Sequence, residues 1–227
     1  IAIGEDINDA FINAYAGDPK SAFGGVIALN RDCTGDLAEA ITAQFFEAVV
    51  APNYDKKALD LFRKKPNLRV LKLGEIKPEH SGETFSKVTG GLLVQDLDTQ
   101  PIGKGDVTTV TEKKPTAKQL EDLLFAWYVV KHVKSNAIVL AKNGMTVGIG
   151  AGQMSRVDSV EIAIRKAAGR QKGSVLASDA FFPFPDSVEA AAKAGITAII
   201  QPGGSIKDKE AIEAADRYGI SMVFTGV

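Results

Sequence analysis

The chain has 227 residues, 27 of them basic and 28 acidic, so its formal net charge is −1. This balance excludes the global attraction on which non-specific nucleic-acid binding depends, and the sequence shows no apolar leader or long membrane-spanning run. The single cysteine, Cys33, cannot form an internal disulfide. We therefore expect a cytoplasmic protein of one large or two modest domains, with neither nucleic acid nor membrane as a partner.

The first part of the chain alternates helical patterns with short apolar runs. Apolar residues recur at helical spacing after Thr34, a predicted N-cap, and Pro66 closes the last of these helices. The predicted helices span 6–16, 35–50 and 55–65, and the predicted strands span 25–29 and 69–73, the latter alternating like a half-buried strand.

The middle of the chain, residues 76–114, differs in kind. It is rich in Gly, Thr, Lys and Asp, and only Gly91 to Val94 is strongly apolar. This composition is typical of a domain boundary or a long connecting ribbon. His80 stands in a polar loop of this segment and is expected to be exposed to solvent.

The last part of the chain begins with a long helix. Thr116 and Gln119 have the spacing of a capping box, and an apolar helix face follows them. Strands and helices then alternate, which predicts an α/β layered fold with crossover helices and ligands bound at strand ends. The predicted strands are 137–141, 146–149, 174–177, 197–200 and 221–224, and the predicted helices are 155–168, 186–194 and 207–218.

A Gly-rich segment, 148–156, carries the strongest functional signal. Glycines let the backbone approach a ligand, and free amides at a helix start attract negative charge, so the segment favours a site for an anionic small molecule. The spacing does not match the dinucleotide fingerprint, and the alternatives are a close packing of two elements or a nucleotide-contacting turn. Arg156 stands just inside the helix start, where it needs an anionic or acceptor partner; the plain alternative is an exposed Arg paired with Asp158 or Glu161.

Together with Ser135-Asn136, Ser178 to Phe184 and Gln201 to Ser205, this segment closely resembles a known family. It is the transformylase half of the bifunctional purine-biosynthesis family that joins an aminoimidazole carboxamide ribonucleotide (AICAR) formyltransferase to an IMP cyclohydrolase. The resemblance implies an α/β fold of two cytidine-deaminase-like three-layer subdomains with mixed sheets and no zinc, at residues 1–114 and 115–227. It also implies a homodimer with the active site at the interface, and the cyclohydrolase domain is absent from this sequence.

The resemblance further implies formyl transfer from 10-formyltetrahydrofolate to the 5-amino group of AICAR. Asn136 is then the catalytic candidate, and Asp179 is a candidate ligand for a monovalent cation such as potassium. The implied substrate-binding residues are Phe23, Gly24, Glu47, Arg156 and Phe181, and the implied folate-binding residues are Phe23, Val157, Pro183 and Asp186. Glu47 departs from the Asp that family members often carry, and its longer side chain shifts the carboxylate.

Simpler roles stand beside these functional ones. Asn136 and Asp179 are also typical of turns or caps, Phe181 to Phe184 of a strand end in a core, and Ser21 to Gly25 of a plain turn. The alternative function is a non-catalytic nucleotide- or folate-binding module of the same fold.

Several chemistries find no support in the sequence. One Cys and two distant His residues give no zinc-ligand spacing, the deaminase zinc signature is missing, and there is no Gly-x-Ser-x-Gly elbow. Lys131-His132 is rejected as the family's catalytic Lys-His pair, because that pair belongs to a segment expected ahead of Ile1. A further family segment is expected after Val227, so we expect these 227 residues alone to be a catalytically incomplete transformylase.

Overall fold

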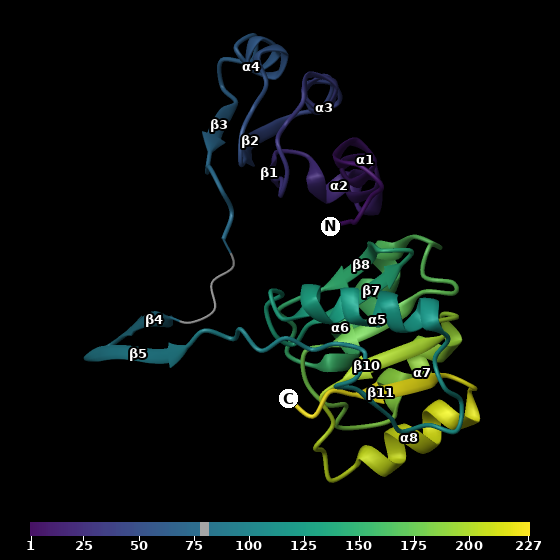
Figure 1. Ribbon diagram of the computed structural model, residues 1–227. Helices are drawn as coiled ribbons and strands as arrows, with labels where there is room; N and C mark the ends of the chain where they lie inside the picture. Colours follow the sequence, from purple (N-terminus) through teal and green to yellow (C-terminus); the bar gives the residue numbers. More distant parts are fainter. Residues whose placement is uncertain (78–81) are drawn as a thin grey trace.

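The computed structural model describes residues 1–77 and 82–227, which form two bodies and an extended arm between them (Figure 1). His80 lies outside the described residues. The first body holds a parallel sheet with the strand order β1-β2-β3. Its elements are α1 (Ile7–Gly17), α2 (Pro19–Ala22), β1 (Gly25–Ala28), α3 (Gly35–Thr42), β2 (Phe46–Ala51), α4 (Lys56–Phe62) and β3 (Arg69–Lys72).

The helices of the first body begin at side-chain caps. Asp6 accepts hydrogen bonds from two backbone N–H groups of α1, Thr34 accepts one from Leu37, and Asp55 accepts one from Ala58. The predicted cap at Thr34 is therefore confirmed. The hydrophobic core of this body lies between the sheet and helices α3 and α4. It includes the fully or almost fully buried residues Cys33, Leu37, Ile41, Val49 and Ala58.

Two predictions for this body are wrong. The helix predicted over 35–50 ends at Thr42, and residues 46–51 form the central strand β2 instead. Val49 and Val50 are β-branched, and their strand pairs with β1 on one side and β3 on the other. A short apolar run of this kind fits the pattern of a buried strand as well as that of a helix. The strand at Arg69–Lys72 exists, but all four of its residues are exposed rather than half-buried.

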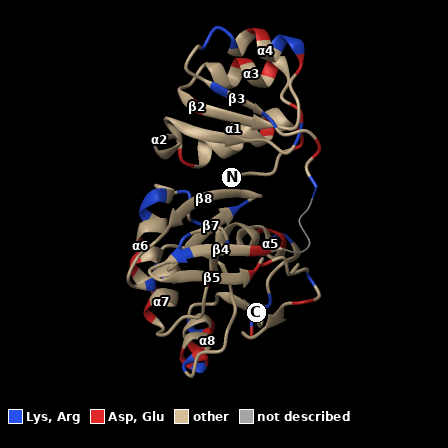
Figure 2. Cartoon of the chain, turned by 90° about the vertical axis from the view of Figure 1, so that its left-hand side faces the viewer, with Lys and Arg blue, Asp and Glu red and all other residues tan. Residues whose placement is uncertain are grey.

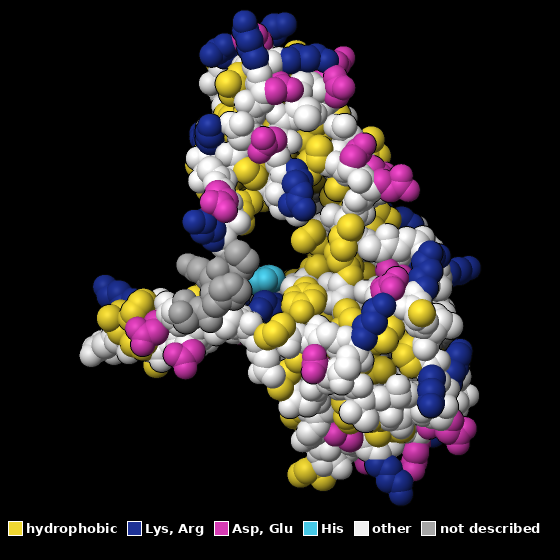
Figure 3. Space-filling view, in the orientation of Figure 1, with side chains coloured by type: hydrophobic (Ala, Val, Ile, Leu, Met, Phe, Trp, Pro, Cys, Tyr) yellow, Lys and Arg dark blue, Asp and Glu magenta, His cyan; other side chains and the backbone are white. Residues whose placement is uncertain are grey.

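The middle segment forms a two-stranded antiparallel arm, β4 (Glu83–Val88) and β5 (Gly91–Asp96), that extends away from both bodies (Figure 1). Every residue of the two strands is exposed, including Phe85, Leu92 and Leu93. Figure 3 shows hydrophobic side chains on this arm and where the two bodies meet.

The second body is a mixed six-stranded sheet with the order β6-β11-β10-β9-β7-β8, in which β9, β10 and β11 run parallel and the outer pairs run antiparallel. α5 covers one face, and α6, α7 and α8 cover the other. Its elements are β6 (Thr108–Thr109), α5 (Ala117–Val130), β7 (Ile138–Lys142), β8 (Met145–Gly150), α6 (Arg156–Ala167), β9 (Val175–Ser178), α7 (Asp186–Lys193), β10 (Ala198–Gln201), α8 (Asp208–Arg217) and β11 (Ser221–Phe224).

The predictions for this body are largely confirmed. Thr116 and Gln119 form the expected capping box, and each predicted strand and helix from residue 137 onward is present within a few residues of its predicted ends. β6 hydrogen-bonds to β11, so residues 108–109 belong to the second sheet. The predicted domain boundary at 114 stays a prediction.

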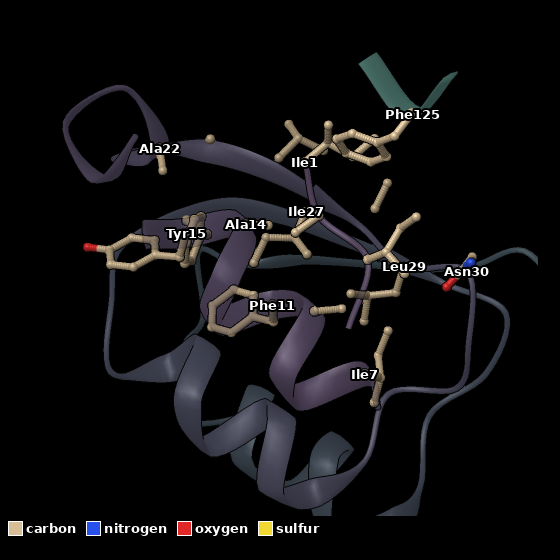
Figure 4. Close-up of a pocket in the computed structure, with 17 residues that line it drawn as sticks. Ile1, Ile7, Phe11, Ala14, Tyr15, Ala22, Ile27, Leu29, Asn30 and Phe125 are labelled. Carbon is tan, nitrogen blue, oxygen red and sulfur yellow. The ribbon is translucent and has the colours of Figure 1, made fainter. Parts of the chain in front are cut away.

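Apolar and polar contacts join the two bodies, and Ile1 and Phe125 of α5 line one apolar groove at this junction (Figure 4). Residues 1–3 pair with β8 through an antiparallel bridge between Ala2 and Met145. The Ile1 nitrogen donates to Thr146 Oγ1 at 2.9 Å, Lys166 Nζ donates to Ser21 Oγ at 2.7 Å, and the Arg170 guanidinium donates to the Ala16 carbonyl. Charged side chains lie mainly on the outer helices such as α4 and α8, whereas the strands carry few (Figure 2). No helix among the described residues is long and apolar enough to cross a membrane.

Two glycines allow α6 to lie against β8. A methyl group at Gly148 would collide with the carbonyl oxygen of Ala163, and one at Gly150 with the carbonyl oxygen of Ser159. Both glycines lie in strand β8, so their role is the close packing of two elements that the sequence left open as an alternative to a ligand-contacting turn. The loop after β8 contains Gly152, which has a positive φ.

We predict that Gly150→Ala destabilises the protein by about 2 kcal/mol, because the added methyl pushes α6 away from β8. Gly91→Ala is the matched control, since nothing lies within 4 Å of its added methyl. Chemical denaturation of both variants measures the effect, and equal stability of the two would contradict this account.

Candidate functional site

The second body carries a hollow of about 430 Å³ where α6 and α7 begin. It is lined by the first turns of both helices, by Asn136 two residues ahead of β7, and by the loop that follows β9. Six of the residues expected at the site line it together: Asn136, Arg156, Val157, Phe181, Pro183 and Asp186.

Arg156 is the charged centre of this site. Ser155 caps α6 by accepting from the Asp158 N–H, and this cap places Arg156 in the first turn. Arg156 is 7% exposed, and its Nη1 donates to Ser178 Oγ at 2.8 Å and to Asp179 Oδ1 at 2.5 Å. The expected acceptor partner is therefore present, and neither of the two acidic residues on its own helix provides it.

Asn136 uses all of its amide atoms in protein contacts. Its Oδ1 accepts from Arg156 Nη2 at 2.7 Å, and its Nδ2 donates to the carbonyls of Gln153 at 2.8 Å and Met154 at 3.2 Å. Its own carbonyl accepts from Ser159 Oγ at 2.7 Å. Asn136 thus joins the segment before β7 to the Gly-rich loop and to α6.

Asp179 is the counter-ion of Arg156. Its Oδ1 also accepts the Ala137 N–H at 2.8 Å. Burial by itself raises the pKa of the Asp179 carboxyl. Hydrogen bonds from Ser135, Arg156 and Ala137 and the positive charge of Arg156 together lower this pKa by more than burial raises it, so it lies below its ordinary value of 3.8. A cation already neutralises this carboxylate, and its role as a potassium ligand stays a prediction.

Aromatic side chains form the rim of the hollow. Phe181 is 41% exposed and Phe184 is 52% exposed, and Lys207 Nζ lies 4.4 Å from the centroid of the Phe184 ring. Asp186 begins α7 and accepts the Ser187 N–H on Oδ1 at 2.6 Å. No group of three His, Cys, Asp or Glu among the described residues is arranged to hold a metal ion.

Three expected residues lie elsewhere, in the first body. Phe23 is 74% exposed and its ring lies 5.2 Å from that of Phe45, next to Gly24. Glu47 pairs with Arg69 at 2.7 Å on the exposed side of β2. None of the three lines the hollow, so their predicted substrate contacts stay predictions.

Sequence reasoning missed the two buried serines that complete the site. Ser178 Oγ accepts from Arg156 and donates to the Ala180 carbonyl at 2.7 Å, and Ser159 Oγ donates to the Asn136 carbonyl. The sequence positions of these serines could have indicated their roles. Ser178 directly precedes Asp179, and Ser159 lies one helical turn after Ser155.

We predict that Asp179→Asn lowers the free energy of unfolding at pH 7 by about 3 kcal/mol, because it leaves the buried Arg156 charge without its counter-ion. The folded-state pKa of Asp179 is lowered, so its stabilisation is present above the ordinary carboxyl pKa and is lost as the pH falls through the lowered value. Urea titrations at pH 7 and pH 3 test both statements.

The control for this variant is Asp36→Asn, which removes an exposed carboxylate paired with Lys57 and should change stability by less than about 1 kcal/mol. The wild type should lose more stability than Asp179→Asn between pH 7 and pH 3. Equal losses would show that the Asp179 contact does not stabilise the fold.

Comparisons with known proteins identify the family to which the chain belongs. Residues 1–166 match the family model described as AICARFT/IMPCHase bienzyme. A bifunctional purine biosynthesis protein PurH from Anoxybacillus flavithermus is 55% identical over 228 residues, one from Thermoanaerobacter sp. is 54% identical over 228, and one from Bacillus cytotoxicus is 52% identical over 227. Each alignment covers 100% of this chain and 44% of the relative, so the chain spans less than half the length of these purine-biosynthesis enzymes. On the family match and these identities, the chain belongs to the AICARFT/IMPCHase bienzyme family.

Proposed function

We propose that this chain serves the transfer of a formyl group from 10-formyltetrahydrofolate to the 5-amino group of AICAR. The observation that carries the proposal is the hollow in which Arg156 and Asn136 are held together beside the exposed ring of Phe181. The proposal includes the deaminase-like nature of the two subdomains, a cytoplasmic location, and a homodimer in which Phe23, Gly24 and Glu47 reach the site from the interface.

The start of α6 suits an anionic substituent. The first N–H groups of a helix have no acceptor within the helix, and the positive end of the helix dipole adds to their attraction for an anion. Both Arg156 and Val157 lie in this first turn and line the hollow. The nucleotide phosphate or another acceptor-rich group of AICAR fits such a place.

The rim of the hollow suits a flat heterocycle. Phe181 and Phe184 leave much of their rings exposed, and an aromatic face stacks favourably on an imidazole or pterin ring. Asp186 lines the hollow beside them, and its Oδ1 accepts from the Ser187 N–H and from Ser187 Oγ. A carboxylate at this place could accept from a ring N–H or amino group of the ligand. Pro183 and Asp186 both line the hollow, which supports their predicted roles in folate binding.

In the transfer, the amine nitrogen of AICAR forms a bond to the formyl carbon and a tetrahedral oxyanion results. The bond from that carbon to N10 of the folate then breaks, N10 gains a proton, and the amine loses one. Asn136 Nδ2 can stabilise the oxyanion if it exchanges its longer hydrogen bond, the 3.2 Å contact to the Met154 carbonyl, for the formyl oxygen.

Proton transfer needs a further group. Of the described residues that line the hollow, Arg156 and Asp186 alone are ionisable, and Arg156 is already paired with Asp179. The Lys-His pair expected from the resemblance would supply this function from outside the hollow.

We predict that Asn136→Ala lowers kcat for formyl transfer by about 100-fold or more in the full-length protein that contains this chain, through loss of an oxyanion donor. AICAR and 10-formyltetrahydrofolate are mixed and the appearance of tetrahydrofolate is followed. The matched control is Asn67→Ala, an exposed residue outside the site, which should retain full activity. Wild-type activity in Asn136→Ala would remove Asn136 from the mechanism, and AICAR binding without turnover by the wild type would favour the non-catalytic binding module.

We also predict that Phe181→Ala weakens binding of AICAR by about 10-fold in the same protein, because the ring that stacks on the base is lost. Isothermal titration calorimetry measures the affinity. Tyr218→Ala is the control, since Tyr218 is similarly exposed at the end of α8. Unchanged affinity in Phe181→Ala would place the base elsewhere.

A further inference from the structure

Gln201 to Ser205 carry part of the family resemblance, but in the described part of the chain none of them lines the hollow. β10 ends at Gln201, and residues 202–207 then connect this strand to α8. β10 runs parallel to β9, so the loops that follow the two strands leave the sheet at the same edge. A side chain at the end of β10 can therefore reach the loop after β9, which does line the hollow.

Gln201 is a fully buried polar residue at this edge. Its Oε1 accepts the N–H of Phe182 at 3.0 Å, and its Nε2 donates to Met222 Sδ at 3.3 Å. A thioether sulfur is a weak acceptor, so the bond to Phe182 is the strong contact of this amide. Burial of an amide costs free energy unless it is hydrogen-bonded, and an apolar side chain of the same size would fill the space without that cost. Holding the Phe182 N–H is therefore what the Gln201 amide contributes at this position.

Phe182 anchors the loop that lines the hollow. Its side chain is fully buried in the hydrophobic core of the second body, and its N–H is held by Gln201. The residues on its two sides, Phe181 and Pro183, line the hollow, and Phe181 is partly exposed. The Gln201 bond thus fixes the backbone between two residues of the candidate site.

The backbone ahead of Phe181 is held in the same way. The Ala180 carbonyl accepts from the hydroxyl of Ser178, a buried residue at the end of β9, at 2.7 Å. Phe181 therefore stands between two backbone groups that buried side chains of adjacent strands hold in place. A ring on such a fixed backbone loses less conformational freedom when a flat ligand stacks on it, which favours binding.

The main chain of Gln201 is fixed by contacts that do not involve its side chain. Its carbonyl accepts the Thr225 N–H at 3.0 Å, and it pairs with Phe224 in the register of β10 and β11. Two residues further along, Gly203 has a φ of 76° and lies so close to the Phe224 ring that an added methyl group would collide with it. A substitution of the Gln201 side chain therefore leaves the strand end and the next loop anchored.

We propose that Gln201 is a positioning residue of the candidate site. Its side-chain amide holds the loop after β9 so that the Phe181 ring faces the base of AICAR in the hollow. Gln201 does not line the hollow and acts through the Phe182 N–H. This inference rests on the proposed function, which supplies AICAR as the ligand, and it gives the segment from Gln201 to Ser205 a role in the site.

The first test is Gln201→Met in the full-length protein that contains this chain, because methionine has nearly the same size and no strong acceptor. We expect the affinity for AICAR, measured by isothermal titration calorimetry, to fall by about 5-fold, which is less than the loss of the ring itself. The kcat at saturating AICAR and 10-formyltetrahydrofolate should stay within about 2-fold of wild type, because binding alone is weakened. Met222→Leu is the matched control. It removes the sulfur on the other side of Gln201, conserves volume and keeps the Phe182 bond, so it should bind AICAR as the wild type does.

A double variant separates positioning from a general loosening of the core. If Gln201 acts through the Phe181 ring, Gln201→Met added to Phe181→Ala should weaken AICAR binding no further. Independent effects would instead multiply in the double variant. Multiplied effects would overturn the proposal, as would wild-type affinity in Gln201→Met when the wild type binds AICAR. A wild type that binds no AICAR would contradict the proposed function itself.

Hydrogen exchange tests the underlying contact without any ligand. The Phe182 amide should exchange at least about 10-fold faster in Gln201→Met than in the wild type, because it loses its acceptor. The Thr225 amide, bonded to the main-chain carbonyl of Gln201, is the internal reference for a general change in stability. If Gln201→Met does not fold, Gln201→Asn, whose side chain is one methylene shorter, should show the same faster exchange. Equal exchange of the Phe182 amide in variant and wild type, with Thr225 protected in each, would show that Gln201 does not hold the loop.

Discussion

The burial of one guanidinium sets the geometry of the candidate site. Arg156 stands at the positive end of α6 and is almost completely removed from solvent, a position that costs several kcal/mol unless the charge is paired and its donors are satisfied. The structure meets this cost with acceptors from two different segments, Asn136 before β7 and Ser178 with Asp179 at the end of β9. Satisfying one charge therefore fixes the start of α6 against two neighbouring strands of the sheet.

This constraint depends on how closely α6 approaches β8. Glycine at 148 and 150 lets the helix backbone lie directly on strand β8. This close packing places Arg156 near the C-terminal end of β9, which Asp179 directly follows. Ser159, one turn further along the same helix, then reaches the Asn136 carbonyl. The first two glycines of the Gly-rich run therefore serve packing, and Gly152, with its positive φ, lies in the loop that follows β8.

The sequence predicted the second body well because its strands and helices are short, alternate regularly and are separated by clear turn signals. The prediction failed at residues 46–50, where an apolar run with β-branched residues follows shortly after an amphipathic helix. The helical spacing of apolar residues continues through this run, so the pattern did not separate the strand from the helix. Loop residues such as Asn136 and Phe181 could be selected from a family resemblance. That Arg156 pairs with Asp179 and not with an acid on its own helix could not, because the pairing depends on the register of β7 against β9.

The ion pair at the centre of the candidate site limits the chemistry that its own residues can perform. Asp179 neutralises Arg156, and the other ionisable residue among the described residues that line the hollow is Asp186. The hollow therefore has few groups that could move protons. If formyl transfer is the function, binding groups and proton-transfer groups come from different parts of the longer protein.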